Sequence, residues 1–520
     1  MIARLLLAAQ ASDAAPPRFV EVTAEAGVRT VATCGRPHKP YIVDSIGTGV
    51  ALFDADGDGD LELYFPNGWR AGGYPPGEEP LPAFHRNEGG MRFSERAREA
   101  GLARPGWWQG CAVGDVDGDG RPELYVTAFG PHAFFRGDGE GAFADRTAAA
   151  GLGDPRWGTS AAFADLDRDG DVDLFVATYI RYRPASRLDP DGADWCDFQG
   201  LRAYCGPQNF PGEEDLLYRN EGDGTFTEVG ASCGLHQGAD SKGLGVVPAD
   251  LDADGDPDLY VANDTARNFL FLNRGDGVFA EDGVFRGAGY DAEGNARAGM
   301  GVDAGDFDGD GDLDLFVTNL DQESSSLFRN LGAAEFEEAS VSLGLEGPSF
   351  PVVGWGTRFF DPDGDGDLDL LSANGHIYPQ ADGVVGRAYA QPLHLYRNER
   401  RRFVESAASF GADLGRARVA RGAGIGDLDE DGDADLVVTV MDGVPSVLRN
   451  DGGDAPGWIR LLLRGRRSNR EGTGARIELR AGGRLQVAEA RASGSFLSSG
   501  DPRPLFGLGG ADRVEALLVR

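Results

Sequence analysis

Apolar residues in this chain occur in short runs separated by turns rich in Gly, Asp and Asn. Runs such as Leu259 to Ala262 combine aromatic and β-branched residues, which is typical of strands. No stretch approaches the ~20 consecutive apolar residues of a membrane helix, so we expect no transmembrane segment. The pattern therefore predicts an all-β protein of many short strands.

One acidic loop recurs seven times between two such runs. Its pattern is Asp-x-Asp-x-Asp-Gly-x-x-Asp/Glu-Leu, and the copies begin at Asp54, Asp115, Asp165, Asp250, Asp306, Asp361 and Asp427. Position 6 is always Gly, which allows a tight turn that points the side chains of positions 1, 3 and 5 inward. Seven copies in register favour a repeated metal site over a set of Asp-rich turns.

The loops supply hard oxygen ligands, which suit Ca²⁺ better than Mg²⁺ because Mg²⁺ demands a stricter octahedron. Of the 85 acidic residues, 34 lie at the odd loop positions. Position 12, where an EF-hand has its bidentate Glu, falls in the apolar run that follows, so these are not EF-hands. We expect up to seven Ca²⁺ ions, with position 7 contributing its backbone carbonyl. The predicted ligands are Asp54, Asp56, Asp58, Asp60 and Glu62; Asp115, Asp117, Asp119, Arg121 and Glu123; Asp165, Asp167, Asp169, Asp171 and Asp173; Asp250, Asp252, Asp254, Asp256 and Asp258; Asp306, Asp308, Asp310, Asp312 and Asp314; Asp361, Asp363, Asp365, Asp367 and Asp369; and Asp427, Asp429, Asp431, Asp433 and Asp435.

Each repeat contains four predicted strands. Strand A is rich in small residues and follows a Gly (Ser160 in one copy); the acidic loop joins it to strand B. Strand C ends in an Arg-Asn turn in five copies, and strand D begins with Phe-x-Glu/Asp. The seventh repeat lacks strand D, but Phe19-Val20-Glu21 near the N-terminus matches it. The sequence therefore predicts a seven-bladed β-propeller over residues 19–455, closed by its N-terminal strand.

Residues outside this ring predict two further segments. Residues 458–520 have 12 Arg and 6 acids, with the alternating pattern of a small β domain that would pack as a basic cap on the acidic propeller. Residues 1–11 have one Arg, a short apolar run and an Ala-x-Ala end, the layout of a secretory signal. A meaningless Ala-rich leader is the alternative.

Charge and cysteine content limit the function. The net charge of −36 repels phosphates, so we expect no nucleic-acid partner. Of five cysteines, Cys196 and Cys205 lie in a Gly/Pro/Asp-rich insertion and form a predicted disulfide if the compartment is oxidising.

These residues resemble a known family. The acidic loops resemble FG-GAP/VCBS repeats of integrin-like propellers, and Arg466 to Arg476 followed by Phe506-Gly507-Leu508-Gly509 resembles the ASPIC/UnbV domain. The combination is similar to bacterial members of the cartilage acidic protein family. The resemblance implies an exported calcium-binding propeller. The Trp-Pro-x-Gly stretch usual in the family is missing, so we expect a truncated tail domain.

We expect a secreted, periplasmic or cell-surface bacterial monomer that binds a protein or glycan and is not an enzyme. Connections between strands B and C vary most in length, so the partner face is predicted opposite the calcium loops. The alternative is an accessory protein or enzyme of enediyne-type natural-product biosynthesis, with its site in the central channel or on that face. His376 is the best candidate residue for it, and a backbone-bonded loop His is the competing interpretation.

Overall fold

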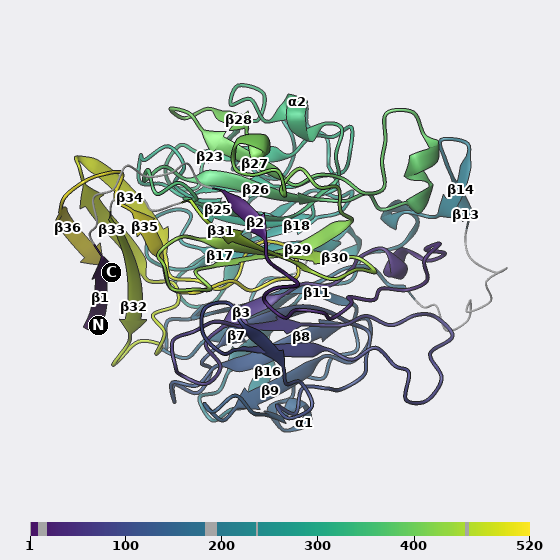
Figure 1. Ribbon diagram of the computed structural model, residues 1–520, viewed down its shortest axis with the longest axis horizontal. Helices are drawn as coiled ribbons and strands as arrows, with labels where there is room; N and C mark the ends of the chain where they lie inside the picture. Colours follow the sequence, from purple (N-terminus) through teal and green to yellow (C-terminus); the bar gives the residue numbers. More distant parts are fainter. Residues whose placement is uncertain (1, 9–17, 183–194, 236–237, 453–456) are drawn as a thin grey trace.

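The computed structural model describes residues 2–8, 18–182, 195–235, 238–452 and 457–520, and it is built almost wholly of strands (Figure 1). Among these residues there are two α-helices of four residues each, α1 (Thr147–Ala150) and α2 (Glu346–Ser349). No helix in the described ranges has the length and apolar content to cross a membrane.

Seven four-stranded antiparallel sheets make up the larger part of the described chain. Each forms one blade, and the prediction of an all-β propeller is confirmed. The blades, from inner to outer strand, are β3 (Ala51–Phe53), β4 (Glu62–Phe65), β5 (Ala83–Asn87) and β6 (Phe93–Glu95); β7 (Trp108–Gly114), β8 (Glu123–Ala128), β9 (Ala133–Gly137) and β10 (Phe143–Asp145); β11 (Gly158–Ala164), β12 (Asp173–Thr178), β15 (Leu216–Asn220) and β16 (Phe226–Glu228); β17 (Gly243–Ala249), β18 (Asp258–Asn263), β19 (Phe269–Asn273) and β20 (Phe279–Glu281); β21 (Val302–Gly305), β22 (Asp314–Val317), β23 (Ser326–Asn330) and β24 (Phe336–Glu338); β25 (Gly354–Phe360), β26 (Asp369–Asn374), β27 (His394–Asn398) and β28 (Phe403–Glu405); and β29 (Ala420–Gly426), β30 (Asp435–Val440), β31 (Ser446–Asn450) and β2 (Phe19–Glu21).

The first strands of consecutive blades contact one another, and β29 of blade 7 contacts β3 of blade 1, so the inner strands form a closed ring. The outer strand of blade 7 comes from the N-terminal region, because β2 pairs with β31 from Phe19–Asn450 to Glu21–Leu448. This pairing gives blade 7 its fourth strand and removes a free sheet edge.

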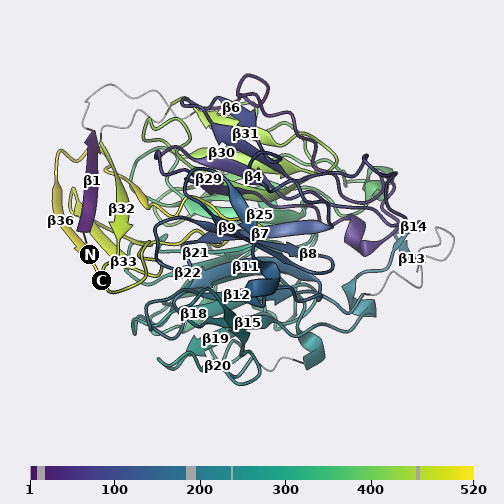
Figure 2. The same cartoon turned by 90° about the horizontal axis from the view of Figure 1, so that it is seen from below.

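Residues 458–520 form a second unit at one end of the molecule (Figures 1 and 2). It contains β32 (Trp458–Arg464) and β35 (Leu505–Gly507) in one sheet, and β33 (Arg476–Ala481), β34 (Arg484–Glu489) and β36 (Val514–Val519) in another. Apolar side chains from both sheets make its core. β1 (Ile2–Ala8) pairs antiparallel with β32. Residues 1 and 9–11 of the predicted signal segment lie outside the described residues, and its cleavage stays a prediction.

A buried stretch of this unit, residues 493–500, enters the centre of the ring; we call it the channel segment. Its backbone and serine hydroxyls bond to the inner strands of six blades. Among these bonds, the N–H of Cys111 donates to the carbonyl of Leu497 at 3.1 Å and that of Val302 to Ser495 at 3.2 Å. Phe496 packs on the buried Trp355, with ring centroids 4.8 Å apart. Residues 493–500 therefore fill the central channel at the level of the inner strands.

The small residues of strand A have a steric cause. A Cβ atom added to Gly49 would lie 1.7 Å from the carbonyl oxygen of Leu497, and one added to Gly422 would lie 2.5 Å from Oγ of Ser498. A Cβ on Gly301 would lie 2.0 Å from the backbone oxygen of Trp355 on the next blade. Glycine is needed at these places because neighbouring backbones and the channel segment approach too closely for a side chain.

Candidate metal centres

The acidic loops share one backbone conformation. In all seven, the position-1 carboxylate accepts the N–H of the position-6 glycine at 2.7 to 3.4 Å, as in Gly120 to Asp115 and Gly170 to Asp165. These glycines have φ between 86° and 102°, which explains why no other residue type occurs there. In all seven loops, the position-5 carboxylate accepts the N–H of position 7 at 2.9 to 3.0 Å. Position 7 therefore turns its N–H toward the loop's own carboxylates.

The position-9 acid ties the loop to two strands. In loop 5, Oδ2 of Asp314 accepts the N–H of Phe307 at 3.2 Å, and Oδ1 accepts the N–H of Asn330 at 2.8 Å. The equivalent asparagine bond occurs in six blades. The side-chain amide of Asn330 then donates to the carbonyl of Leu251, which belongs to the acidic loop of the preceding blade, at 2.7 Å.

These asparagine bridges run around the ring. They join Asn87 to Leu428, Asn220 to Val116, Asn273 to Leu166, Asn330 to Leu251, Asn398 to Phe307 and Asn450 to Pro362. Sequence reasoning took the Arg-Asn pair only as a turn signal and missed this role. The signal was present in the recurrence of Asn at one position of strand C.

Several loop oxygens are buried and have no hydrogen-bond partner. They are Oδ1 of Asp115, Asp250, Asp363 and Asp429, Oε1 of Glu123 and Oδ2 of Asp369. A buried polar atom without a partner costs about 1–3 kcal/mol, and a charged one costs more. These atoms therefore need a ligand, and a cation bound between them satisfies that need.

Loop carboxylates also stand close together. In loop 5, ligand oxygens of Asp306, Asp308 and Asp314 lie within 4.8 Å of one another, and all three residues are buried. Seven such acidic groups occur among the described residues. At ~4 Å, two unit charges repel by about 4 kcal/mol near a protein surface, so such a group requires protons or a cation.

The pKa values of the position-9 acids reflect this environment. Burial, together with the neighbouring loop carboxylates, raises the pKa of Glu62 to about 8, of Glu123 to about 9 and of Asp314 to about 9, although backbone N–H groups act in the opposite direction. The same causes raise the pKa of Asp306 at position 1 to about 7. Without a cation, these groups hold protons near neutral pH. The oxygen-only donor set, its burial and its unpaired atoms fit Ca²⁺.

Arginines neutralise part of the loop charge. Arg86, Arg136 and Arg397 on the third strand of their blades lie 2.6, 2.5 and 2.9 Å from position-3 carboxylates. The side chains of these arginines are 45–46% exposed, so these pairs contribute little to stability. Each supplies one positive charge to its loop, and Arg136 also lies 3.1 Å from Asp119, so most of the loop charge remains.

The C-terminal unit covers the face of the propeller that carries the acidic loops. Its side chains hydrogen-bond or pair with six of them, four through Arg and two through Glu. The contacts are Arg503 with the Gly59 carbonyl, Glu471 with the Asp115 N–H, Glu489 with the Asp250 N–H, Arg476 with the Gly311 carbonyl, Arg484 with Asp367, and Arg460 with Asp427. The Arg460 and Asp427 side chains are only 4% and 1% exposed and lie 2.9 Å apart.

On the opposite face, the long insertion of blade 3 forms the hairpin β13 (Trp195–Phe198) and β14 (Leu201–Tyr204) (Figure 1). Cys196 and Cys205 are joined by a disulfide, with Cα atoms 4.9 Å apart. This hairpin packs on blade 6, where Phe198 and Tyr378 have ring centroids 4.6 Å apart.

His376 has a structural environment. It is fully buried, and its Nδ1 accepts the N–H of Tyr378 at 3.0 Å. Its Nε2 lies 3.6 Å from Asp321, which pairs with Arg387 at 2.8 Å. Its Nε2 is buried and has no hydrogen-bond partner among the described residues, since 3.6 Å is too long for a hydrogen bond.

Two family patterns match the chain. The FG-GAP-like repeat matches residues 124–176, 211–261, 250–317 and 306–372, and the ASPIC and UnbV family matches residues 465–520. The chain contains FG-GAP repeats and an ASPIC/UnbV segment. It is also similar to cartilage acidic protein 1, with 32% identity to the mouse protein over 205 residues and 30% to the human protein over 204. These matches cover 37% of the chain and 28% and 27% of the relatives, so the chain spans under a third of their length.

Solved structures with related folds share little sequence. A lectin from Agrocybe aegerita that recognises non-reducing terminal N-acetylglucosamine matches with a TM-score of 0.42 and 16% identity, over 78% of this chain and 94% of the lectin. A rhamnogalacturonan lyase from Bacillus licheniformis matches with a TM-score of 0.39 and 14% identity, over 83% and 75%.

Proposed function

We propose that the protein is an exported, calcium-binding β-propeller of the cartilage acidic protein family, from a bacterium, that acts as a monomeric interaction module. Calcium ions bound in up to seven loops stiffen the ring, and the face opposite the loops binds a protein or glycan. The observation that carries the calcium assignment is the set of buried, unpaired carboxylate oxygens in the loops.

Two features support the partner face, and a third supports export. The C-terminal unit covers the acidic loops, so the insertion face is the more open end of the ring. That face carries the β13–β14 hairpin, where Trp195 is half-buried under the guanidinium of Arg202 at 4.2 Å. Aromatic and arginine side chains of this kind are enriched at binding hot spots. The Cys196–Cys205 disulfide agrees with export, because disulfides persist in oxidising compartments.

Chelation tests the calcium assignment. We expect EDTA to lower the melting temperature of the full chain by roughly 10 °C or more, because ions that bind only the folded state stabilise it. Added Ca²⁺ should restore the original melting curve, whereas added Mg²⁺ should restore it only in part. A melting temperature that EDTA leaves unchanged would reject the assignment.

The partner face is tested by substitution. Calcium-dependent binding to a glycan array or to a protein of the exported fraction should be lost in Trp195→Ala. It should persist in Arg513→Ala, which changes an exposed position of the C-terminal unit. Equal binding by both variants would place the partner elsewhere. His376, the best candidate residue for an enzyme, is fully buried, and we propose no second function.

A further inference from the structure

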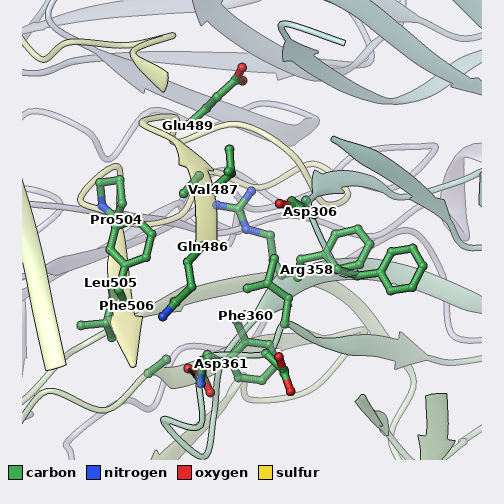
Figure 3. A pocket seen from close by; sticks show the side chains of 18 of the residues that line it. Asp306, Arg358, Phe360, Asp361, Gln486, Val487, Glu489, Pro504, Leu505 and Phe506 are labelled. Carbon is green, nitrogen blue, oxygen red and sulfur yellow. Dashed lines mark hydrogen bonds between the residues drawn. The ribbon is translucent and has the colours of Figure 1, made fainter. Parts of the chain in front are cut away.

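A cavity of about 550 Å³ lies between the C-terminal unit and blades 5, 6 and 7 (Figure 3). Phe360 of β25 forms part of one wall, and Val487 of β34 with Leu505 and Phe506 of β35 forms the facing wall. This volume is within the range of small-molecule sites, which combine apolar walls with a few polar groups.

Both arginines and acids line the cavity, and several of the acids belong to the metal loops. Seven arginines and eight acids line it, and four of these acids (Asp306, Asp308, Asp361 and Asp427) occupy ligand positions of loops 5 to 7. The remaining acids are Asp303, Asp367, Glu489 and Asp501. Calcium in loops 5 to 7 would offset two of the five carboxylates of each loop, which makes the surroundings of the seven guanidinium groups less negative and favours an anion there.

Among these arginines, Arg358 is the one best placed to bind an anion in the cavity. Its Nη1 donates to the Ser493 carbonyl at 2.8 Å and to Oδ1 of Asp303 at 3.3 Å. Arg491 donates to the same Asp303 oxygen at 3.0 Å, so two guanidinium groups share one carboxylate oxygen. Within the described residues, Nε and Nη2 of Arg358 have no hydrogen-bond acceptor. Figure 3 shows this guanidinium projecting between Asp306 and Val487.

The sequence pattern marks the same place independently. Three residues before the first loop Asp, five blades have a small or apolar residue: Ala51, Ala112, Ala162, Val247 and Gly424. Blades 5 and 6 instead have Asp303 and Arg358, and both line the cavity. Charge in a strand that is otherwise small and apolar has a cost, and packing alone does not require it.

We propose that this cavity binds a small amphipathic anion, with Arg358 holding the anionic group and Phe360, Val487 and Leu505 contacting the apolar part. The ligand class is a carboxylate or sulfonate attached to an aromatic or aliphatic group. This site rests on the proposed function, because calcium in loops 5 to 7 lowers the negative charge around the cavity.

The test uses the full chain saturated with Ca²⁺, with calcium binding measured separately by titration calorimetry. The probe is 8-anilinonaphthalene-1-sulfonate, and its uncharged counterpart is N-phenyl-1-naphthylamine. We expect one saturable fluorescence-enhancing site for the anion and at least about tenfold weaker binding of the neutral probe.

Variants locate the probe. Arg358→Gln should weaken binding of the anion about 10- to 100-fold, the usual loss for a charge-assisted hydrogen bond, and should leave the neutral probe unaffected. Leu505→Trp, which fills the cavity from its other wall, should also weaken binding. Arg513→Gln is the control and should bind as the unchanged protein does. Circular dichroism and the calcium titration show whether each variant is folded.

Two results would overturn the proposal while leaving the calcium assignment intact, and a third would overturn both. One is normal calcium binding without saturable binding of the anion, which would leave the proposed function standing. The other is unchanged binding of the anion in Leu505→Trp and in Arg358→Gln, which would place the probe elsewhere. A chain that binds no calcium would overturn both the proposed function and this site.

Discussion

Replacing Gly49 with alanine tests whether the channel segment holds the propeller and the C-terminal unit together. The φ of Gly49 is not in the left-handed region, so an alanine is compatible with the backbone. The added Cβ would lie 1.7 Å from the carbonyl oxygen of Leu497, whereas ordinary contacts are 3.4–4 Å. The channel segment must therefore move by more than an ångström, because backbone atoms on both sides cannot rotate away.

The expected loss in the free energy of unfolding follows from the hydrogen bonds that such a shift would break. Cys111 donates to Leu497 at 3.1 Å, Leu52 donates to Ser499 at 3.0 Å, and the Ser499 N–H donates to Val50 at 2.9 Å. Losing two or three of these buried bonds, at about 1–3 kcal/mol each, gives a loss of about 2–9 kcal/mol.

The assay is urea unfolding of calcium-saturated protein, combined with limited trypsin digestion of the Arg-rich C-terminal unit. Gly347→Ala is the matched control, because its Cβ would meet no atom within 4 Å and its φ is also outside the left-handed region. We expect the control to lie within about 0.5 kcal/mol of the unchanged protein. If Gly49→Ala unfolds and resists trypsin as Gly347→Ala does, the channel segment does not occupy the ring centre as described.

Two further predictions concern the loops. Asn330→Ala removes the side-chain donor to the Leu251 carbonyl and should lower the free energy of unfolding in urea by about 1–3 kcal/mol. Asn295→Ala changes an exposed asparagine and should cost little. Equal losses in the two variants would contradict the asparagine bridge. Burial and nearby carboxylates raise the pKa of Glu123 to about 9, so calcium must displace a proton from this residue at neutral pH. Because fewer protons need to be displaced at higher pH, calcium affinity should rise between pH 6.5 and 9. In metal-free protein the free energy of unfolding should instead fall as pH rises. The folded state keeps the proton on Glu123, whereas the unfolded chain loses it above pH ~4.5. Calorimetry in two buffers of different ionisation enthalpy measures the released protons, and a pH-independent affinity would contradict this reasoning.

Much of the fold could be predicted because it repeats. The position-6 glycines mark every blade, and the Phe-x-Glu/Asp strands and Arg-Asn turns mark most of them, so register and strand order follow from spacing. The displaced Phe19-Val20-Glu21 strand could be placed only because six other copies showed what the last repeat lacks.

The contacts between distant parts could not be predicted in the same way. The channel segment has no counterpart in the repeat, and its bonds join Leu497 to Cys111 across 386 residues. The asparagine bridges also join different repeats, so a single copy does not show them. Arg358 was visible as a departure from the strand A pattern, but only the arrangement of the C-terminal unit shows that it faces a cavity.

The most direct test of the central claim is the number of calcium ions held by each chain. The protein is dialysed against about 1 mM Ca²⁺ and then desalted. Elemental analysis by mass spectrometry should then find several calcium ions per chain, up to seven. Calcium no higher than in the matched buffer would contradict the account, since the buried loop oxygens would then need another partner.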